Sequence, residues 1–489
     1  MTRAPVLSAV VGLLAAALSL LIAPEPFRLG PARAGDAGLA GRVEAVLAGD
    51  TLGYRGLAVA EIDGGRTVTA MLGDSAGGPL FEIGSVTKTL TGMLFADMVV
   101  EGLVRPDETL GDALSAVRFE HDATASITLA ELASHRSGLP RLAPGIRTLA
   151  RSALAGLLGV NPYAGQDADA ILDAARRIAP DDRGTFAYSN FGMALLGQAL
   201  AARAGKPYPE LVTQRILQPL GMSDTYVTVP DPRPAGLASG SIATGHSAAA
   251  WSGAGYAPAG VGVRSTAADL SRLVLATMAG TAPGADAAEP RFATDDGERI
   301  GYGWFTHRYG NRTITWHNGG TGGFRSYVAF DRASGRGVVV LSNTDRAVEW
   351  IGLRMLGVDP PSAAGWRDLL RPGVTVALLM FAAGSLLLLA VRTARGSQRR
   401  GPDRLRVLEE TLATAAMLLI AHRIGAWLTI PPWWWSAAVG VAAAGVTALA
   451  LRWRTTPTRD GRGPAARSAQ FAVSGAISLL IIGAMAAHL

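Results

Sequence analysis

The sequence predicts an α+β protein, in which an antiparallel sheet is flanked by helices with an all-helical subdomain and is followed by four transmembrane helices. Strand-like runs lie near both ends of the region 36–360, and helical periodicity fills the part between them. Four long runs almost free of charge follow in residues 372–489. The arginines of this last region gather between the runs, as they do in the cytoplasmic loops of membrane proteins.

The charge of the chain is concentrated in two places. The formal net charge of the 489 residues is +6, yet the stretches 392–406 and 452–467 together contain 11 Arg against two Asp, which leaves the remainder slightly negative. A basic excess confined to two loops is not the footprint of a nucleic-acid-binding protein, so nucleic acid is excluded as a partner. The chain has no cysteine, which excludes disulfides, thiolate metal ligands and a cysteine nucleophile.

Residues 1–35 match an export signal. Arg3 precedes an apolar run from Val6 to Ala23, and Ala32-Arg33-Ala34 provides a small-x-small cleavage site. The run is long enough for either a signal peptide or an N-terminal membrane anchor. Both alternatives place the region that follows outside the cytoplasm.

The region 36–360 begins with a β-hairpin. The strand-like runs Gly56–Ile62 and Arg66–Leu72 are joined by Asp63-Gly64-Gly65, a strong turn signal. Helical patterns follow at 81–104, 127–133, 168–178, 190–204 and 265–278.

Local signals refine these elements. Thr128 and Glu131 have the spacing of a capping box for the helix at 127–133, and Ser265 or Thr266 starts the last helix. The stretch 280–299, rich in Gly, Ala and Asp, is predicted to be a surface loop. The first hairpin is expected to join three later strands in one antiparallel sheet, namely Thr313–His317, Phe324–Phe330 and Gly337–Asn343.

The C-terminal region predicts four membrane spans, at 372–391, 411–430, 433–451 and 468–487. The connections after the first and third spans carry the Arg clusters, and the short connection after the second leads into Trp433-Trp434-Trp435. By the positive-inside rule the Arg loops are cytoplasmic and the Trp cluster lies at the opposite interface. The sequence therefore predicts a multi-pass protein of the cell membrane whose region 36–360 is extracytoplasmic.

Ser85 and Lys88 are the first candidates for chemistry. They lie three residues apart at the start of the helix predicted at 81–104, which we expect to be amphipathic, so the hydroxyl and the amine share a face. Unpaired N–H groups at a helix start favour the negative charge of an activated serine. Lys88 and Lys206 are the only lysines, against 43 Arg, and lysine can lose its proton whereas arginine cannot.

Two further clusters follow in order, Tyr188-Ser189-Asn190 and His317-Asn318-Gly319-Gly320. A Ser-x-x-Lys pair alone is a weak motif. The joint pattern of a nucleophile and a base, then a phenol and an amide, then a polar, glycine-rich strand end is much more specific. It resembles the serine β-lactamase and penicillin-recognising DD-peptidase superfamily over residues 36–350, in particular the branch whose second motif is Tyr-x-Asn.

The flanking sequence resembles the same branch, which includes cephalosporinase-type β-lactamases, D-alanyl-D-alanine carboxypeptidases, D-amino-acid peptidases and carboxylesterases. The stretches that carry this likeness are 81–85, 132–140, 219–222 and 265–270. The resemblance implies a β-lactamase/transpeptidase-like fold and an acyl-enzyme mechanism without a cofactor.

Roles follow from the resemblance position by position. Ser85 is expected to be the acylated nucleophile, and Lys88 the base that deprotonates it. Tyr188 is expected to pass protons to the leaving group, and the division of the base role between Lys88 and Tyr188 stays open. Asn190 is expected to hold the substrate and to orient Lys88.

The third motif is expected to bind substrate through His317, Gly319 and Gly320. The backbone N–H groups of Ser85 and Gly320 would form the oxyanion hole. The β-lactamases have Lys-Thr-Gly where this chain has His317-Asn318-Gly319, and a histidine is not permanently charged near neutral pH. This departure favours an ester or amide, including peptidoglycan-like substrates, over a β-lactam.

Other functions compete with a membrane-anchored serine hydrolase. One is a penicillin-binding sensor, although the short Arg-rich loops leave no room for a cytoplasmic output domain. Another is a non-catalytic module that binds the cell wall, against which the presence of all three motifs speaks. No His-Glu-x-x-His or comparable spacing occurs among the seven histidines, so no metal is predicted.

Overall fold

The computed structural model describes residues 3–77, 80–227, 236, 238–294, 297–360, 366–394, 403–458 and 464–486, and the chain divides into two compact units. The sheet unit comprises Phe27–Ala243 and Ser247–Pro361. The helical unit comprises Met1–Pro26, Thr244–His246 and Ser362–Leu489.

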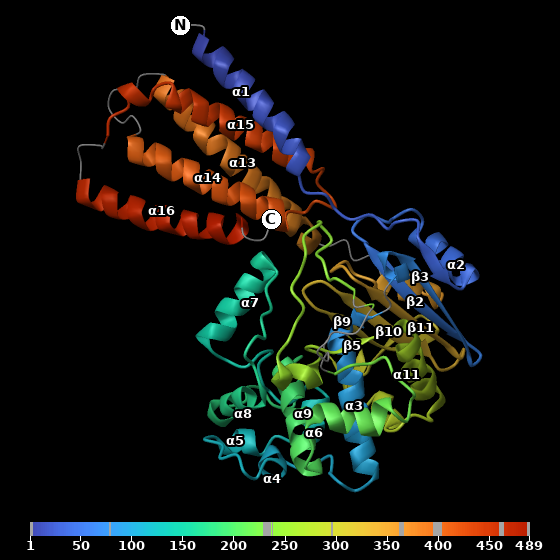
Figure 1. The fold of residues 1–489 in the computed structure, drawn as a ribbon. Helices are drawn as coiled ribbons and strands as arrows, with labels where there is room; N and C mark the ends of the chain where they lie inside the picture. Colours follow the sequence, from blue (N-terminus) through green and yellow to red (C-terminus); the bar gives the residue numbers. More distant parts are fainter. Residues whose placement is uncertain are drawn as a thin grey trace. The chain divides into compact units, whose positions relative to one another are not determined.

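The sheet unit is built around a nine-stranded sheet in which every neighbouring pair is antiparallel (Figure 1). The strand order is β1-β3-β2-β11-β10-β9-β8-β7-β6. The predicted union of the first hairpin with the last three strands is confirmed, because β2 pairs with β11 along its length. The strands are β1 Arg33–Gly35, β2 Gly56–Asp63, β3 Arg66–Gly73, β6 Phe292–Ala293, β7 Arg299–Ile300, β8 Phe305–Tyr309, β9 Arg312–Gly320, β10 Arg325–Asp331 and β11 Arg336–Ser342. A second, two-stranded sheet pairs β4 (Phe81–Glu82) with β5 (Arg264–Ser265).

The two faces of the nine-stranded sheet bury two separate cores. Successive side chains of a strand point to opposite faces, so Leu57 and Val59 lie in one core and Ala58 and Ala60 in the other. Helices α2 (Ala37–Leu47) and α12 (Glu349–Met355) cover the first face. Helices α3 (Thr87–Val100) and α11 (Ala267–Ala279) belong to the core of the second. Thr266 is the N-cap of α11, which confirms one of the two starts predicted for this helix.

A helical subdomain follows β4 and precedes β5 in the sequence, and Figure 1 shows α4, α5, α6 and α8 gathered around α9. The predictions at 168–178 and 190–204 are confirmed to within a residue, and α9 starts and ends where expected. The helices are α4 Leu110–Ala113, α5 Asp122–Ala125, α6 Leu129–Ala133, α7 Ile146–Leu158, α8 Ala168–Arg177, α9 Asn190–Ala204 and α10 Tyr208–Val212.

The helix predicted at 81–104 is wrong at its start and in its character. Phe81 pairs with Ser265 in β4, a short 3-10 turn covers Gly84–Val86, and α3 begins only at Thr87. The helix is not amphipathic, because every side chain from Thr87 to Ala96 is buried. Its position inside the core on the second face of the sheet explains why it has no polar face.

The surface loop predicted at 280–299 is also wrong in part. A short 3-10 turn with buried alanines covers Ala285–Ala288, and β6 and the start of β7 add two strands at the edge of the sheet. Strand β8, which follows, has no counterpart in the sequence prediction. Two-residue strands are too short to show an alternating pattern, which explains the first omission.

The long helices of the helical unit are α1 Arg3–Ser19, α13 Trp366–Ala394, α14 Arg404–Ile424, α15 Trp433–Ala450 and α16 Pro464–Ala486. Four segments of the described chain are long and apolar enough to cross a membrane, namely Ala4–Ile22, Leu369–Ala394, Trp433–Ala450 and Arg467–Met485. They coincide with the N-terminal apolar run and with three of the four predicted C-terminal spans. The remaining predicted span, 411–430, is helical over most of its length and belongs to α14. This helix is not among the four segments that are long and apolar enough to cross a membrane. This helix carries Glu409 and Glu410 as well as basic residues, and its membrane insertion stays a prediction.

Helix α1 packs against α15 within the helical unit. A Cβ atom on Gly12 would lie 2.8 Å from the carbonyl oxygen of Gly440 and 2.9 Å from the Cβ of Ala444, so the two backbones approach closely, as small residues allow between apolar helices. In the sheet unit, the predicted cleavage site falls on β1, where Arg33 and Ala34 pair with Leu72 and Met71 of β3.

Candidate active site

Ser85 lies in the short turn that joins β4 to α3, half-buried, with Lys88 one helical turn further on. Lys88 Nζ is 2.8 Å from Ser85 Oγ, so the contact predicted from their spacing is confirmed. The same Nζ donates a hydrogen bond to the carbonyl oxygen of Ala259 at 2.7 Å. The two oxygens hold the amine in one place, beside the hydroxyl.

The Lys88 side chain is fully buried and no carboxylate pairs with it in the part of the chain that the structure describes. Burial lowers the pKa of Lys88 well below its ordinary value, and the charge of Arg141 lowers it further. Both effects favour the neutral form of the amine, which can accept the serine proton and which arginine could not adopt.

Glycines bring the serine against strand β9. Gly84 has a φ of 48°, and a Cβ on it would lie 2.8 Å from the backbone nitrogen of Gly320. A Cβ on Gly319 would collide with the carbonyl oxygen of Ile83 and the hydroxyl of Ser326. Any side chain at Gly84 or Gly319 would push the turn that carries Ser85 away from the strand.

The end of β9 is open on the side of this turn. Strand β8 pairs with β9 only as far as Phe305 opposite Trp316, whereas β10 pairs with it through Gly320. The segment His317–Gly320 thus keeps one edge unpaired by any described strand, and the turn Gly84–Val86 contacts both β9 and β10. An exposed strand edge offers N–H and C=O groups to a substrate backbone.

Tyr188 approaches Ser85 and Lys88 from the helical subdomain. Its hydroxyl interacts with Ser85, and Lys88 Nζ lies 5.1 Å from the centre of its ring. Burial of the hydroxyl raises the pKa of Tyr188 to about 12, although Ser85 and Arg141 lower it by a smaller amount. The phenol is consequently protonated at neutral pH and can donate a hydrogen bond.

His135 holds the Tyr188 segment in place. The backbone N–H of Ser189 donates to His135 Nδ1 at 3.2 Å, the N–H of Ala187 donates to the His135 carbonyl oxygen at 2.7 Å, and the rings of His135 and Tyr188 are 4.4 Å apart. Burial lowers the pKa of His135 well below its ordinary value, so the ring is neutral. His135 itself has a left-handed φ of 56°, a conformation that costs a non-glycine residue energy.

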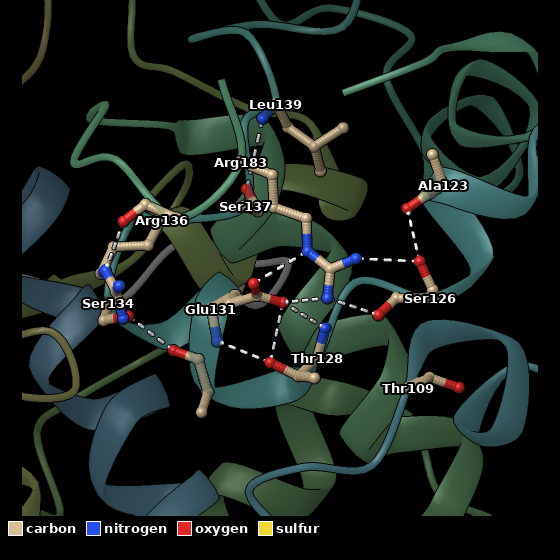
Figure 2. A network of polar contacts seen from close by, with 12 residues as sticks. Thr109, Ala123, Ser126, Thr128, Glu131, Ser134, Arg136, Ser137, Leu139 and Arg183 are labelled. Carbon is tan, nitrogen blue, oxygen red and sulfur yellow. Dashed lines mark hydrogen bonds and ion pairs between the residues drawn. The ribbon is translucent and has the colours of Figure 1, made fainter. Parts of the chain in front are cut away.

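A polar network fastens the two segments that carry His135 and Tyr188 (Figure 2). Thr128 and Glu131 form the predicted capping box at the start of α6, and Arg183 donates to both carboxylate oxygens of Glu131, at 2.8 and 2.7 Å. Arg183 also donates to the hydroxyl and carbonyl oxygens of Ser126. A bidentate ion pair of this kind fixes orientation as well as distance.

Asn190 starts α9, two residues after Tyr188, and its side chain contacts Tyr163 rather than Lys88. Nδ2 donates to the Tyr163 hydroxyl at 3.3 Å, and Oδ1 is buried without a partner among the described residues. The prediction that Asn190 orients Lys88 is therefore wrong, because Ala259 and Ser85 do so. The free Oδ1 is an acceptor that a substrate N–H can use.

His317 is buried at the open edge of β9. Its Nδ1 lies 2.6 Å from the carbonyl oxygen of Asn318, so this nitrogen carries the proton, and Nε2 is buried with no partner in the described part of the chain. Burial lowers the pKa of His317 to about 3. The third motif thus presents a neutral acceptor where the β-lactamase pattern presents a cation.

The structure brings Ser85, Lys88, Tyr188, His317 and Gly320 into one site and places Asn190 at its helical edge. Sequence reasoning missed the Ala259 carbonyl and Arg141, whose guanidinium lies 5.3 Å from the Tyr188 ring centre. Neither carries a motif of its own, and only the fold brings them near. No group of three or more potential metal ligands occurs within the described ranges.

A neutral lysine beside a serine, at the start of a buried helix and facing an antiparallel strand, is the arrangement of the penicillin-recognising serine hydrolases. The chain belongs to the β-lactamase family, whose model, described as Beta-lactamase, matches residues 34–355.

Individual relatives agree with this assignment. The chain is 33% identical over 189 residues to the D-alanyl-D-alanine-carboxypeptidase/endopeptidase AmpH of Escherichia coli, covering 37% of this chain and 47% of that protein. It is 27% identical over 305 residues to a β-lactamase of Pseudomonas fluorescens, covering 54% and 79%. The chain thus spans about half the length of the first of these relatives.

A solved structure shares the fold. The class C β-lactamase from Rhodobacter sphaeroides superposes with a TM-score of 0.54 at 24% identity, covering 64% of this chain and 96% of that one.

Proposed function

We propose that this protein is a membrane-anchored, extracytoplasmic serine hydrolase that forms an acyl-enzyme on Ser85 and cleaves ester or amide bonds. The observation that carries the proposal is the contact of 2.8 Å between Ser85 Oγ and the buried, neutral amine of Lys88. Members of its family include β-lactamases and a D-alanyl-D-alanine carboxypeptidase.

The first half-reaction acylates the serine. Lys88 Nζ takes the proton of Ser85, whose Oγ forms a bond to the substrate carbonyl carbon. The negative charge that develops on the carbonyl oxygen is stabilised by the backbone N–H groups of Ser85 and Gly320. The bond to the leaving group then breaks, and the leaving group receives a proton through Tyr188.

The second half-reaction releases the acyl group. A water molecule attacks the ester carbonyl, gives its proton to the Lys88–Tyr188 pair, and Ser85 leaves with its hydroxyl restored. Asn190 Oδ1 accepts a hydrogen bond from an N–H of the acyl portion, and the open edge of His317–Gly320 aligns the rest of the substrate. No metal or cofactor takes part in this scheme.

The membrane anchor rests on the four long apolar helices and on the Arg-rich stretches beside them. We infer that these stretches face the cytoplasm and that the sheet unit is outside. A reporter fused after Arg395 is then expected to behave as cytoplasmic and one fused after Leu489 as external. The opposite pair of results would overturn this topology.

A fluorophosphonate probe tests the chemistry. Wild-type protein is expected to be labelled and Ser85→Ala to remain unlabelled, whereas Ser134→Ala, which removes a buried serine elsewhere, is expected to be labelled like the wild type. Equal labelling of the Ser85→Ala variant would remove the proposal. Turnover of p-nitrophenyl esters, D-alanyl-D-alanine peptides and nitrocefin then ranks the bond types, and we expect nitrocefin to be the poorest substrate because His317 is neutral.

A further inference from the structure

Helix α7 of the sheet unit exposes an apolar stripe. Its apolar residues recur at the spacing of one helix face. Three of the large ones, Ile146, Leu149 and Leu154, are 79%, 68% and 45% exposed, and Ala150 and Ala153 between them are exposed as well. No other described helix or strand packs closely against α7, and none of its described side chains is buried. A contiguous apolar surface of this kind marks a contact with another apolar surface.

The polar residues of α7 lie on its more shielded side. Arg151 and Ser152 are half-buried, and Arg151 donates a hydrogen bond to the carbonyl oxygen of Ala164. The hydroxyl oxygen of Ser152 is buried without a partner among the described residues. The neighbouring helix α8 has the ordinary arrangement of a soluble protein, since it buries Ile171 and exposes Arg176. The inverted pattern of α7 therefore indicates an apolar environment outside the helix.

The chain itself can supply that environment. Four segments of the helical unit are long and apolar enough to cross a membrane, so a bilayer would be tethered to the sheet unit by the same polypeptide. Charge favours the same partner, because residues 132–166 contain four arginines and no Asp or Glu. Arginines combined with an exposed apolar helix face are typical of helices that lie at an anionic lipid surface.

We propose that α7 lies in the surface of the bilayer that anchors the protein, with its apolar stripe among the lipid chains just below the headgroups. The proposal rests on the membrane anchor proposed above and adds a second contact, made by the sheet unit. A bilayer, unlike a protein partner, is present wherever the anchored chain is present. It also requires no complementary shape from a stripe of Ile, Leu and Ala.

The contact would bring the candidate active site close to the lipid, because the chain on both sides of α7 reaches Asn190. The backbone N–H of Asn190 donates to the carbonyl oxygen of Arg141 at 3.0 Å, and its side chain donates to the Tyr163 hydroxyl at 3.3 Å. With α7 held in the bilayer surface, the helical edge of the site would face substrates that are themselves at the membrane.

The test uses the full-length protein, reconstituted in vesicles of phosphatidylglycerol and phosphatidylcholine. The chain has no cysteine, so one substitution provides one thiol for an environment-sensitive fluorophore. Leu149→Cys and Leu154→Cys place the fluorophore on α7. Val100→Cys is the matched control, since Val100 is 76% exposed in the sheet unit but adjoins Glu101. Phe381→Cys, at a residue of α13 that is 71% exposed, reports the anchor.

The measurement is quenching by a phosphatidylcholine whose spin label lies just below the headgroups. An interfacial helix buries its apolar face about 5–10 Å deep. We therefore expect the emission at both α7 positions to shift to shorter wavelength and to fall about twofold or more with the spin-labelled lipid. The emission at Val100→Cys should not change. Ile146→Glu, added to Leu154→Cys, puts a charge into the stripe and is expected to remove the quenching.

Quenching at Phe381→Cys without quenching on α7 would overturn the proposal and leave the anchor intact. A shift to shorter wavelength on α7 without quenching would also overturn it, because a protein surface, such as a second copy of the chain, would then cover the stripe. Equal quenching at Val100→Cys would show that the contact is not specific to α7. If Phe381→Cys is not quenched either, the membrane anchor itself is wrong and the contact of α7 falls with it.

Discussion

The two walls of the candidate active site differ in how far their polar groups are already paired. The helix wall, formed by Ser85, Lys88 and Tyr188, is closed upon itself, since each of its functional groups contacts another one. The strand wall, formed by His317–Gly320, leaves His317 Nε2 without a partner among the described residues and one strand edge unpaired by any described strand. The difference shows which wall is built for chemistry and which for recognition: a nucleophile must be oriented before the substrate arrives, whereas binding groups gain most when the substrate is their first partner.

Replacement of Lys88 is expected to have the largest effect, because it removes the base from the closed wall. Lys88→Met keeps the length and burial of the side chain and is expected to lower kcat/KM on an ester by roughly a hundred- to ten-thousandfold. Steady-state kinetics and fluorophosphonate labelling measure the loss, and a melting curve checks that the variant folds. A variant that retains wild-type turnover would show that the helix wall is not the chemical one.

Gly319→Ala tests how closely the strand wall must approach the helix wall. The new Cβ would collide with the Ile83 carbonyl oxygen and with Ser326, so the turn that carries Ser85 must shift relative to Gly320. Since one misplaced oxyanion donor costs about a hundredfold or more, kcat is expected to fall by that order. Gly41→Ala is the control, because it lies on helix α2 where an added Cβ meets no atom within 4 Å. Similar kinetics for Gly319→Ala and Gly41→Ala would mean that catalysis does not depend on the close approach of the strand wall to the helix wall.

Tyr188→Phe removes one hydroxyl and keeps the ring packed against His135. We expect kcat to fall by about a hundredfold, because proton transfer by a positioned group is worth at least that much. The loss should be larger on amides than on activated esters, since an amine leaves only when protonated. A series of leaving groups with rising pKa measures this, and a loss independent of the leaving group would assign Tyr188 to positioning instead of proton transfer.

Much of the helix wall could be predicted from the sequence because its contacts are local. The spacing of Ser85 and Lys88 is set by one helical turn, and the capping box of Thr128 and Glu131 by another. What the local pattern could not predict is the start of α3 at Thr87. The apolar run continues upstream of it, but Phe81 pairs with Ser265, far along the chain, and tertiary pairing overrode local periodicity there.

The strand wall was less predictable, since its properties depend on burial and on distant residues. Sequence reasoning placed His317 at the strand end and foresaw that it carries no permanent charge, but the degree of its burial follows from the packing of β8 and the helical subdomain. The position of the Ala259 carbonyl oxygen, which holds Lys88 from 171 positions away, is likewise a consequence of topology. Backbone groups carry no sequence signature.

Arg141 acts electrostatically on Lys88 and Tyr188 of the helix wall and provides the smallest predicted effect. Its charge adds to burial in lowering the pKa of Lys88, because a nearby cation disfavours the protonated amine. Activity is expected to rise with pH as Lys88 loses its proton, so Arg141→Gln should raise the pKa of Lys88 and move the acid limb of the kcat/KM profile to higher pH. Arg141 is exposed, and salt screens such charges. High ionic strength should therefore weaken the effect of Arg141 and move the acid limb of the wild-type profile toward that of Arg141→Gln. An acid limb that stays in place in Arg141→Gln at low salt would leave burial as the sole cause of the neutral amine.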